Sequence, residues 1–175
     1  MKRISFYLFA MLIGSMSFLT ACSDDDDDTV TAEKVAGTYN GTLVVSLEGQ
    51  EVANEAKSLS LVKNGDDAVD VVIKDFNLNV SLGENISIPV SLGDLKVDKC
   101  VLTLKDGKST FSGTTELKGI EVPVGSSPIT ADCTVDITAA TVDGKNLSLP
   151  IVVGVSIPGG TKLMDVNVQY TGVKK

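Results

Sequence analysis

The sequence predicts an all-β fold, an antiparallel meander of about eight strands closed into a barrel. From Gly37 onward, short runs alternate apolar and polar residues, and no stretch has a trustworthy helical period. Tight turn signals separate these runs, among them Asn64-Gly65 and Asp106-Gly107. Closure of such a meander removes unpaired strand edges. A two-sheet β-sandwich is the alternative that the same alternation permits.

The first half of this region predicts three runs of strand. Runs 37–47 and 51–63 are separated by a turn at 48–50, and the second ends at the hairpin signal 64–67. The next run, 69–76, closes at Asp75-Phe76 and is followed by 77–82. The apolar positions that define these faces are Leu43, Val45, Leu47, Leu59, Leu61, Val69, Val71 and Ile73.

The middle of the chain is less regular. Pro89 lies within the run 86–90 and cannot donate to a ladder, which predicts an edge, a bulge or a strand end. The apolar parity changes from odd at Val97 to even at Cys100, so the register is expected to slip between them. After the run 109–117, the segment 119–130 is rich in proline and glycine and is expected to form a long loop, either a lid over a barrel mouth or an ordinary surface connection.

The clearest alternation comes last. Run 133–139 is followed by 147–157, whose eleven residues would extend about 36 Å at ~3.3 Å per residue. A strand of that length needs to bend, and Pro150 and Gly154 are suitable places. Run 164–170 completes a set of eight or nine strands.

A leader precedes the folded part. Lys2 and Arg3 form a positive start, and the apolar run 4–19 is shorter than a membrane-spanning helix and ends in small residues. Residues 1–21 are therefore expected to be a signal peptide. The segment 19–22, Leu-Thr-Ala-Cys, resembles the bacterial lipobox, which implies acylation of Cys22 and a stable lipid anchor in the membrane.

The segment 22–31 is expected to be an acidic tether. Adjacent like charges repel each other and bury nothing, so this segment should be extended, and it lacks the pattern of a calcium loop. Beside an acylated cysteine, the run resembles the export signal that places Bacteroidetes lipoproteins on the outer face of the outer membrane. Its residues are Ser23, Asp24, Asp25, Asp26, Asp27 and Asp28. Thr29 resembles the acceptor of a short O-glycosylation sequon of the same phylum.

Composition excludes several function classes. Removal of residues 1–21 leaves 154 of the 175 residues, a length typical of one domain. Of the 15 basic residues, 13 remain beside all 23 acidic ones, so the net charge of −10 argues against nucleic-acid binding. The chain contains no histidine, which excludes a Ser-His-Asp hydrolase and a His-ligated zinc site. We expect no metal and no cofactor, and the absence of tryptophan weakens a sugar-stacking module.

Cys100 and Cys133 are the cysteines that remain for pairing. A compartment outside the inner membrane permits a disulfide between them, which would stabilise the fold by a few kcal/mol. Each cysteine also lies on the apolar parity of its run, which is typical of a small buried hydrophobic side chain. Both interpretations remain open. Two thiols alone do not suit a metal site.

Four segments look like the calycin-like β-barrel lipoproteins of gut Bacteroidetes: 35–43, 75–76, 144–149 and 166–172. The resemblance extends over nearly the whole of 32–175. It implies a lipocalin-related barrel domain on a lipid anchor, and it brings no activity and no functional residues with it. A fold does not determine a function.

The leading functional hypothesis is a non-enzymatic, surface-exposed outer-membrane lipoprotein that binds a small apolar or amphipathic ligand in its barrel. An eight-stranded barrel has room for packed side chains or one small ligand. If the core is filled, the second hypothesis is a display module that binds a protein or a glycan through its outer face. The outward positions that suit this role are Thr134, Asp136, Thr138 and Thr141, and Tyr39 and Tyr170 serve either as contacts or as packing residues.

A hydrolase of unknown substrate is the third hypothesis. Lys63, Lys74, Asp70 and Asp75 are the residues that would supply a lysine or carboxylate base. No pattern places them around a nucleophile. We therefore expect no enzyme and assign no catalytic residue.

Overall fold

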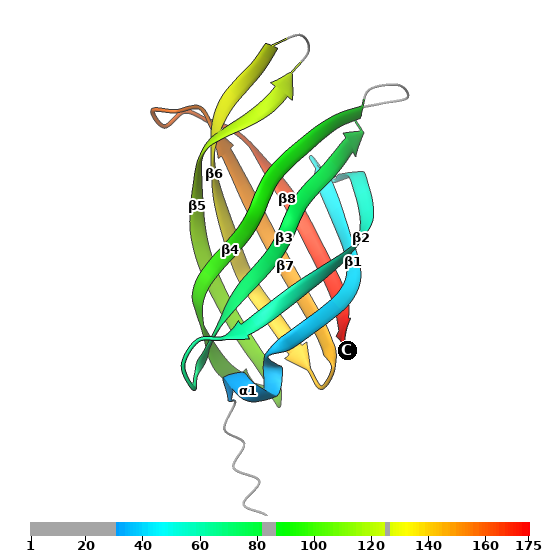
Figure 1. Cartoon of the computed structure of the whole chain (residues 1–175), viewed down its shortest axis with the longest axis vertical. Helices are drawn as coiled ribbons and strands as arrows, with labels where there is room; N and C mark the ends of the chain where they lie inside the picture. Colours follow the sequence, from blue (N-terminus) through cyan, green and yellow to red (C-terminus); the bar gives the residue numbers. More distant parts are fainter. Residues whose placement is uncertain (1–30, 82–86, 125–126) are drawn as a thin grey trace, which may run out of the picture.

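The protein folds into a closed barrel of eight antiparallel strands in meander order (Figure 1). The computed structural model describes residues 31–81, 87–124 and 127–175. Its elements are α1 (Ala32–Val35), β1 (Gly37–Leu47), β2 (Gln50–Lys63), β3 (Ala68–Ser81), β4 (Ser87–Lys105), β5 (Lys108–Val124), β6 (Ser127–Asp143), β7 (Asn146–Ser156) and β8 (Lys162–Lys174). β8 pairs back onto β1, which closes the sheet. The predicted barrel is confirmed, and the β-sandwich alternative is wrong.

The alternation in the sequence becomes the inward and outward faces of the barrel wall. Apolar side chains of α1 and all eight strands form one core cluster. The largest that are fully buried are Tyr39, Tyr170, Leu43, Leu59, Leu61, Ile73 and Leu149. Because this cluster draws on α1 and on every strand, we expect residues 31–175 to fold as one unit.

One end of the barrel is closed by α1, a short helix that buries Ala32 and Val35 against the core (Figure 1). The Ala32 N–H donates to the Asp66 carbonyl at 2.8 Å, and Lys174 Nζ donates to the Lys34 carbonyl at 3.0 Å. We call this the closed end. The opposite end, where β1, β3, β5 and β7 finish, is called the open end. No helix in the described ranges has the length and hydropathy needed to cross a bilayer.

The predicted register slip in β4 is confirmed. Val69 pairs with Cys100, whereas Val71 pairs with Val97, so β4 contains an extra residue at this point. Lys99 adopts a φ of 53°, a left-handed conformation that is uncommon outside glycine and marks the bulge. The bulge changes the parity of the strand, and apolar side chains on both sides of it therefore face the core.

Two predictions of strand ends are wrong. The segment 119–130 is not a loop, because β5 and β6 pair from Ile120↔Ala131 to Pro123↔Pro128, after a bulge at Gly119. β3 also continues past Asp75, where the φ of 47° marks another bulge. Bulges absorb residues that break the alternation, so a strand continues where the pattern alone predicts a stop. The predicted turn at 83–85 lies outside the described residues.

The barrel wall has two short joints. β2 pairs with β3 over four residue pairs, from Ser60↔Val72 to Lys63↔Val69. β4 pairs with β5 over four as well, from Leu102↔Phe111 to Lys105↔Lys108. Both joints lie near the closed end, while β3 and β4 remain paired with each other up to Ser81↔Ser87. We call the unpaired stretch between β2 and β3 the β2–β3 seam.

Candidate functional site

The predicted anchor and tether lie outside the described residues. This holds for the signal peptide 1–21, for Cys22, for the acidic run 23–28 and for Thr29. The first element of the described chain, α1, begins at Ala32, the residue at which the barrel domain was predicted to start.

Both barrel cysteines are buried and free. Cys100 packs so closely against Gly113 that a Cβ on that glycine would lie 2.5 Å from the cysteine Sγ. Cys133 pairs with Leu117, four positions farther along β5, a separation of about 13 Å along the strand. That distance exceeds the ~7 Å limit between the Cα atoms of a disulfide. The structure therefore places the two thiols as buried side chains, and burial raises the pKa of Cys100 to about 11.

Tyr39 and Tyr170 are completely buried packing residues. The Tyr39 hydroxyl donates to the Val35 carbonyl at 2.7 Å, which ties α1 to β1. The Tyr170 hydroxyl lies 2.9 Å from the Tyr39 carbonyl and 3.2 Å from the Lys57 carbonyl, bridging β8 to β1 and β2. Burial raises the pKa of Tyr170 to about 12, so its hydroxyl stays protonated. Neither ring is a surface contact.

The four candidates for an acid–base cluster are not brought together around a cleft. Lys63 pairs with Asp66 at 3.0 Å on the surface, and Lys74 and Asp75 are exposed. Asp70 is buried and is held by Asn64 and Lys99, which gives it a structural role. The described ranges also contain no group of three or more His, Cys, Asp or Glu residues able to hold a metal ion.

The open end exposes part of the apolar lining. Six hydrophobic side chains pack against the core but remain partly buried: Leu47, Leu92, Leu117, Ile120, Val155 and Val166. Ile129 and Met164 follow the inward register of β6 and β8 and are 41% and 49% exposed. Partly exposed apolar side chains at one end of a barrel are typical of a binding surface. We call this set of eight residues the apolar rim.

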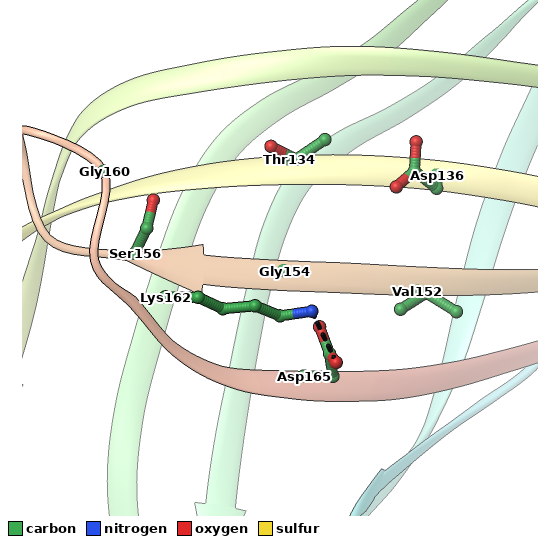
Figure 2. A pocket seen from close by; sticks show the side chains of 8 residues that line it. All are labelled: Thr134, Asp136, Val152, Gly154, Ser156, Gly160, Lys162 and Asp165. Carbon is green, nitrogen blue, oxygen red and sulfur yellow. Dashed lines mark ion pairs between the residues drawn. The ribbon is translucent and has the colours of Figure 1, made fainter.

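A polar groove lies on the outer face of the wall near the same end (Figure 2). Its volume is about 420 Å³, and its lining is Thr134, Asp136, Val152, Gly154, Ser156, Gly160, Lys162 and Asp165. Lys162 Nζ pairs with Asp165 Oδ2 at 2.8 Å. Gly154 contributes no side chain, so the floor of the groove is low at its centre. The predicted outward positions Thr134 and Thr138 are exposed, and Asp136 and Thr141 are half-exposed.

Two charged residues on the inward register of β2 were not identified from the sequence. Lys57 pairs with Gly41 and Glu55 pairs with Leu43, so both lie on the face of β2 that carries the buried Leu59. Their odd parity, shared with Leu59 and Leu61, is a signal in the sequence. It is easily missed, because charged residues are normally expected on the solvent face.

Comparisons with known proteins agree with this architecture. The family model of the calycin-like beta-barrel domain matches residues 35–173. A crystal structure of a protein assigned to the outer membrane of Bacteroides fragilis is similar, with 21% identity and a TM-score of 0.54. The match covers 82% of this chain and 52% of the other, so this chain spans about half the length of that protein. The comparison with curated proteins found no significant match. The chain therefore belongs to the family of calycin-like β-barrel domains.

Proposed function

We propose that this protein is a non-enzymatic outer-membrane lipoprotein, displayed on the cell surface, whose barrel binds a small apolar or amphipathic molecule at its open end. The observation that carries the proposal is the apolar rim, in which inward-facing hydrophobic side chains remain partly exposed. The other end of the same barrel is closed by α1. Calycin-like barrels are typically binding domains, which supports binding over catalysis.

Burial of the rim is the driving force for binding. Each Å² of apolar surface removed from water contributes about 25 cal/mol, so a ligand covering a few hundred Å² gains several kcal/mol. Polar groups are then needed only to orient the ligand. The rim supplies the apolar part of such a site, since its members come from β1, β4, β5, β6, β7 and β8.

The proposed location is supported by two features. The segment 19–28 resembles a lipobox followed by an acidic export signal, which would attach Cys22 to the membrane and carry the barrel to the outside. The similar protein of Bacteroides fragilis is also assigned to the outer membrane.

Neighbouring residues of β8 offer a matched test. Met164 follows the inward register, whereas Leu163 lies at the register shift between Met164 and Lys162 and has no partner on β7, yet they are similarly exposed, at 49% and 45%. We expect Met164→Gln to weaken binding of a neutral apolar probe, dodecanol, to residues 31–175 by about threefold to tenfold, since it removes apolar contact. Leu163→Gln should leave binding unchanged. Equal effects of the two substitutions would argue against a site at the rim.

The outer groove favours a second candidate function, the recognition of a glycan on the outer face. Asp136, Thr134 and Lys162 offer acceptors and donors around the low floor at Gly154, which suits the hydroxyl groups of a sugar. Gly154→Val would fill the groove, because the added Cβ meets only ordinary contacts, 3.6 Å from Asp165 Oδ1. Glycan-array binding that is lost in Gly154→Val and kept in Met164→Gln would support this function. No glycan binding by the unaltered domain would exclude it.

A further inference from the structure

The polar groove on the outer face is formed where one side chain is missing from three neighbouring strands (Figure 2). Thr134 on β6 pairs with Gly154 on β7, and Gly154 pairs with Asp165 on β8, so the three residues form one row across the wall. The Cα atoms of Thr134 and Asp165 are two strand spacings apart, about 10 Å. The groove over the glycine has a volume of about 420 Å³. Small-molecule sites have about 300–1,000 Å³, so the groove has room for a ring-sized ligand.

Asp136 brings a negative charge to this groove. Its side chain is part of the lining, next to Val152, its partner on β7, and it is half-exposed. No residue of 31–81, 87–124 or 127–175 gives the Asp136 carboxylate a hydrogen bond or an ion pair. A carboxylate accepts hydrogen bonds at both of its oxygens. The acceptor capacity of Asp136 is therefore available to a ligand in the groove.

The lysines nearest the groove are already paired. Lys162 Nζ lies 2.8 Å from Asp165 Oδ2, on the far side of the groove floor from Asp136 (Figure 2). On β5, Glu116 faces the lining residue Thr134 in the ladder, and its carboxylate lies 3.4 Å from Lys118 Nζ. Each of these pairs is neutral as a whole. Neither lysine is left to neutralise Asp136.

The lining of the groove suits a positively charged sugar. Asp132, which pairs with Ser156 of the lining, adds a second negative charge on the same face, and a negative surface attracts a cation. Ser156 and Thr134 supply hydroxyl groups for the hydroxyls of a sugar, and Val152 supplies an apolar surface for the C–H groups of its ring. A metal ion is a poorer match, since the described ranges contain no group of three or more His, Cys, Asp or Glu residues.

We propose that the outer groove binds an amino sugar, whose protonated amino group pairs with Asp136 and whose ring lies over Gly154. Diagonal neighbours on adjacent strands, as Asp136 and Gly154 are, lie about 7–8 Å apart, a distance that a pyranose ring and its amino group span. A charge-assisted hydrogen bond is about twice as strong as a neutral one, so Asp136 selects the charged sugar over its acetylated form. The proposal rests on the second candidate function, because it names the ligand class of that same groove.

The test compares two trimers with the same backbone, β-1,4-linked glucosamine and β-1,4-linked N-acetylglucosamine, at pH 6, where the free amine is protonated. Two-dimensional NMR titrations of residues 31–175 report the affinity, the location of binding and the fold together. This segment omits the acidic run 24–28, which would itself attract the charged trimer. We expect the glucosamine trimer to bind about tenfold more tightly than the acetylated one and to shift the amides of 134–136 and 152–156. Asp136→Asn should weaken its binding about tenfold, the size expected for one charge-assisted hydrogen bond.

Asp143→Asn is the matched control. It removes a carboxylate from the same strand at the closed end, where the side chain is 62% exposed, and both affinities should stay unchanged. The acetylated trimer should bind Asp136→Asn as it binds the unaltered domain. If Asp143→Asn weakens the glucosamine trimer as much as Asp136→Asn does, the trimer is attracted by the overall negative charge and the Asp136 contact is wrong.

The remaining outcomes separate the contact from the site. If both trimers bind the groove equally well, or if Asp136→Asn weakens both equally, the contact with the amino group is wrong while a glycan site stands. If the amide of Nα-acetyl-lysine binds as tightly as the glucosamine trimer, the groove takes lysine side chains and the sugar assignment is wrong. If neither trimer binds the unaltered domain, the amino-sugar assignment is wrong, and the glycan array then tests the second candidate function on its own.

Discussion

Asp70 shows how one residue joins three segments near the closed end. Its carboxylate accepts hydrogen bonds from Asn64 Nδ2 at 2.6 Å and from the Lys99 N–H at 2.9 Å, and it pairs with Lys96 at 3.0 Å. Burial by itself would raise the pKa of Asp70, but these hydrogen bonds and the Lys96 charge outweigh it and lower the pKa to about 2. The β2–β3 hairpin is thereby fixed to the β4 bulge.

We predict that Asp70→Asn lowers the free energy of unfolding by about 2 kcal/mol at pH 7, since the charge-assisted bonds are lost. The carboxylate of Asp70 has a lower pKa in the folded state than the 3.8 of the unfolded chain, so its ionised form stabilises the fold at pH values above 3.8. This stabilisation is lost as the pH falls through about 2, where the folded-state carboxylate becomes protonated. The difference in the free energy of unfolding between the unaltered domain and Asp70→Asn, measured by urea unfolding, should therefore become smaller between pH 4 and pH 2.

Asp143→Asn is the control for this measurement. Asp143 pairs with Lys108 at 3.1 Å, but its side chain is 62% exposed, so its loss should change stability by less than 1 kcal/mol. If the difference in unfolding free energy between the unaltered domain and Asp70→Asn stays constant from pH 4 to pH 2, the carboxylate charge is not what stabilises this junction.

Individual residue roles were partly predictable from the sequence. Tyr39 and Tyr170 lie on the apolar parity, which left packing as one of their two predicted roles, and the structure shows packing. Asp70 was identified only as a general candidate base. Its partners Asn64 and Lys99 are brought next to it by the β2–β3 hairpin and by the β4 bulge, and these contacts are not visible in the sequence. Lys57 was missed although it shares the odd parity of Leu59 and Leu61, because a charged residue is normally expected on the solvent face.

At the scale of elements, the β3–β4 ribbon is the part of the barrel least tied to its neighbours. It is joined to β2 and to β5 by four residue pairs each, whereas β7 and β8 pair over nearly their full length. Gly113 lets Cys100 and Val97 pack closely against β5, so side chains rather than a ladder hold this side. Strands with few backbone partners open at lower free energy than the rest of a fold.

We predict that amide hydrogen exchange is faster in 73–77 and 91–99 than in 147–153, because amides of β3 that face β2 and amides of β4 that face β5 have no strand partner there. Mass spectrometry of exchanged peptides from residues 31–175 measures this directly. Equal protection of the two regions would contradict a ribbon held mainly at the closed end.

The extents of the strands were less predictable than their existence. Turn signals at Asn64-Gly65 and Asp106-Gly107 separate the strands as expected, since glycine favours the conformations that these turns need. The segment 119–130 was predicted as a loop because of its prolines. In the structure Pro123 faces Pro128 near the end of the β5–β6 hairpin, where little of the ladder depends on their missing N–H groups.

At the scale of the molecule, alternation and tight turns were sufficient to predict the barrel, because each local pattern favours the same antiparallel neighbour. The polar groove was not predictable, since it depends on β6, β7 and the start of β8 lying side by side around Gly154. The apolar rim was also not predictable from the sequence. Alternation shows which residues face inward, but it does not show whether an inward valine is buried in the core or exposed at the end of the barrel.

The proposed anchor gives a prediction for the whole molecule in its cell. Cys22→Ala should abolish labelling by radioactive palmitate and release the protein from the membrane pellet, because the acylated thiol is gone. Replacement of Asp24, Asp25, Asp26, Asp27 and Asp28 by alanine should keep the anchor but reduce cleavage by protease added to intact cells. If the Cys22→Ala protein is still acylated, the predicted anchor is wrong. If the protein with alanine at 24–28 is cleaved by external protease as readily as the unaltered chain, the predicted surface display is wrong.

The most direct test of the central claim is native mass spectrometry of residues 31–175, secreted into the periplasm of the protein's own host and purified without detergent. We expect a reproducible extra mass that organic solvent releases, and its fragmentation should identify an amphipathic molecule. The same experiment on Met164→Gln should show less of it. A bare protein mass from several growth media would contradict a ligand at the open end and direct attention to the polar groove on the outer face.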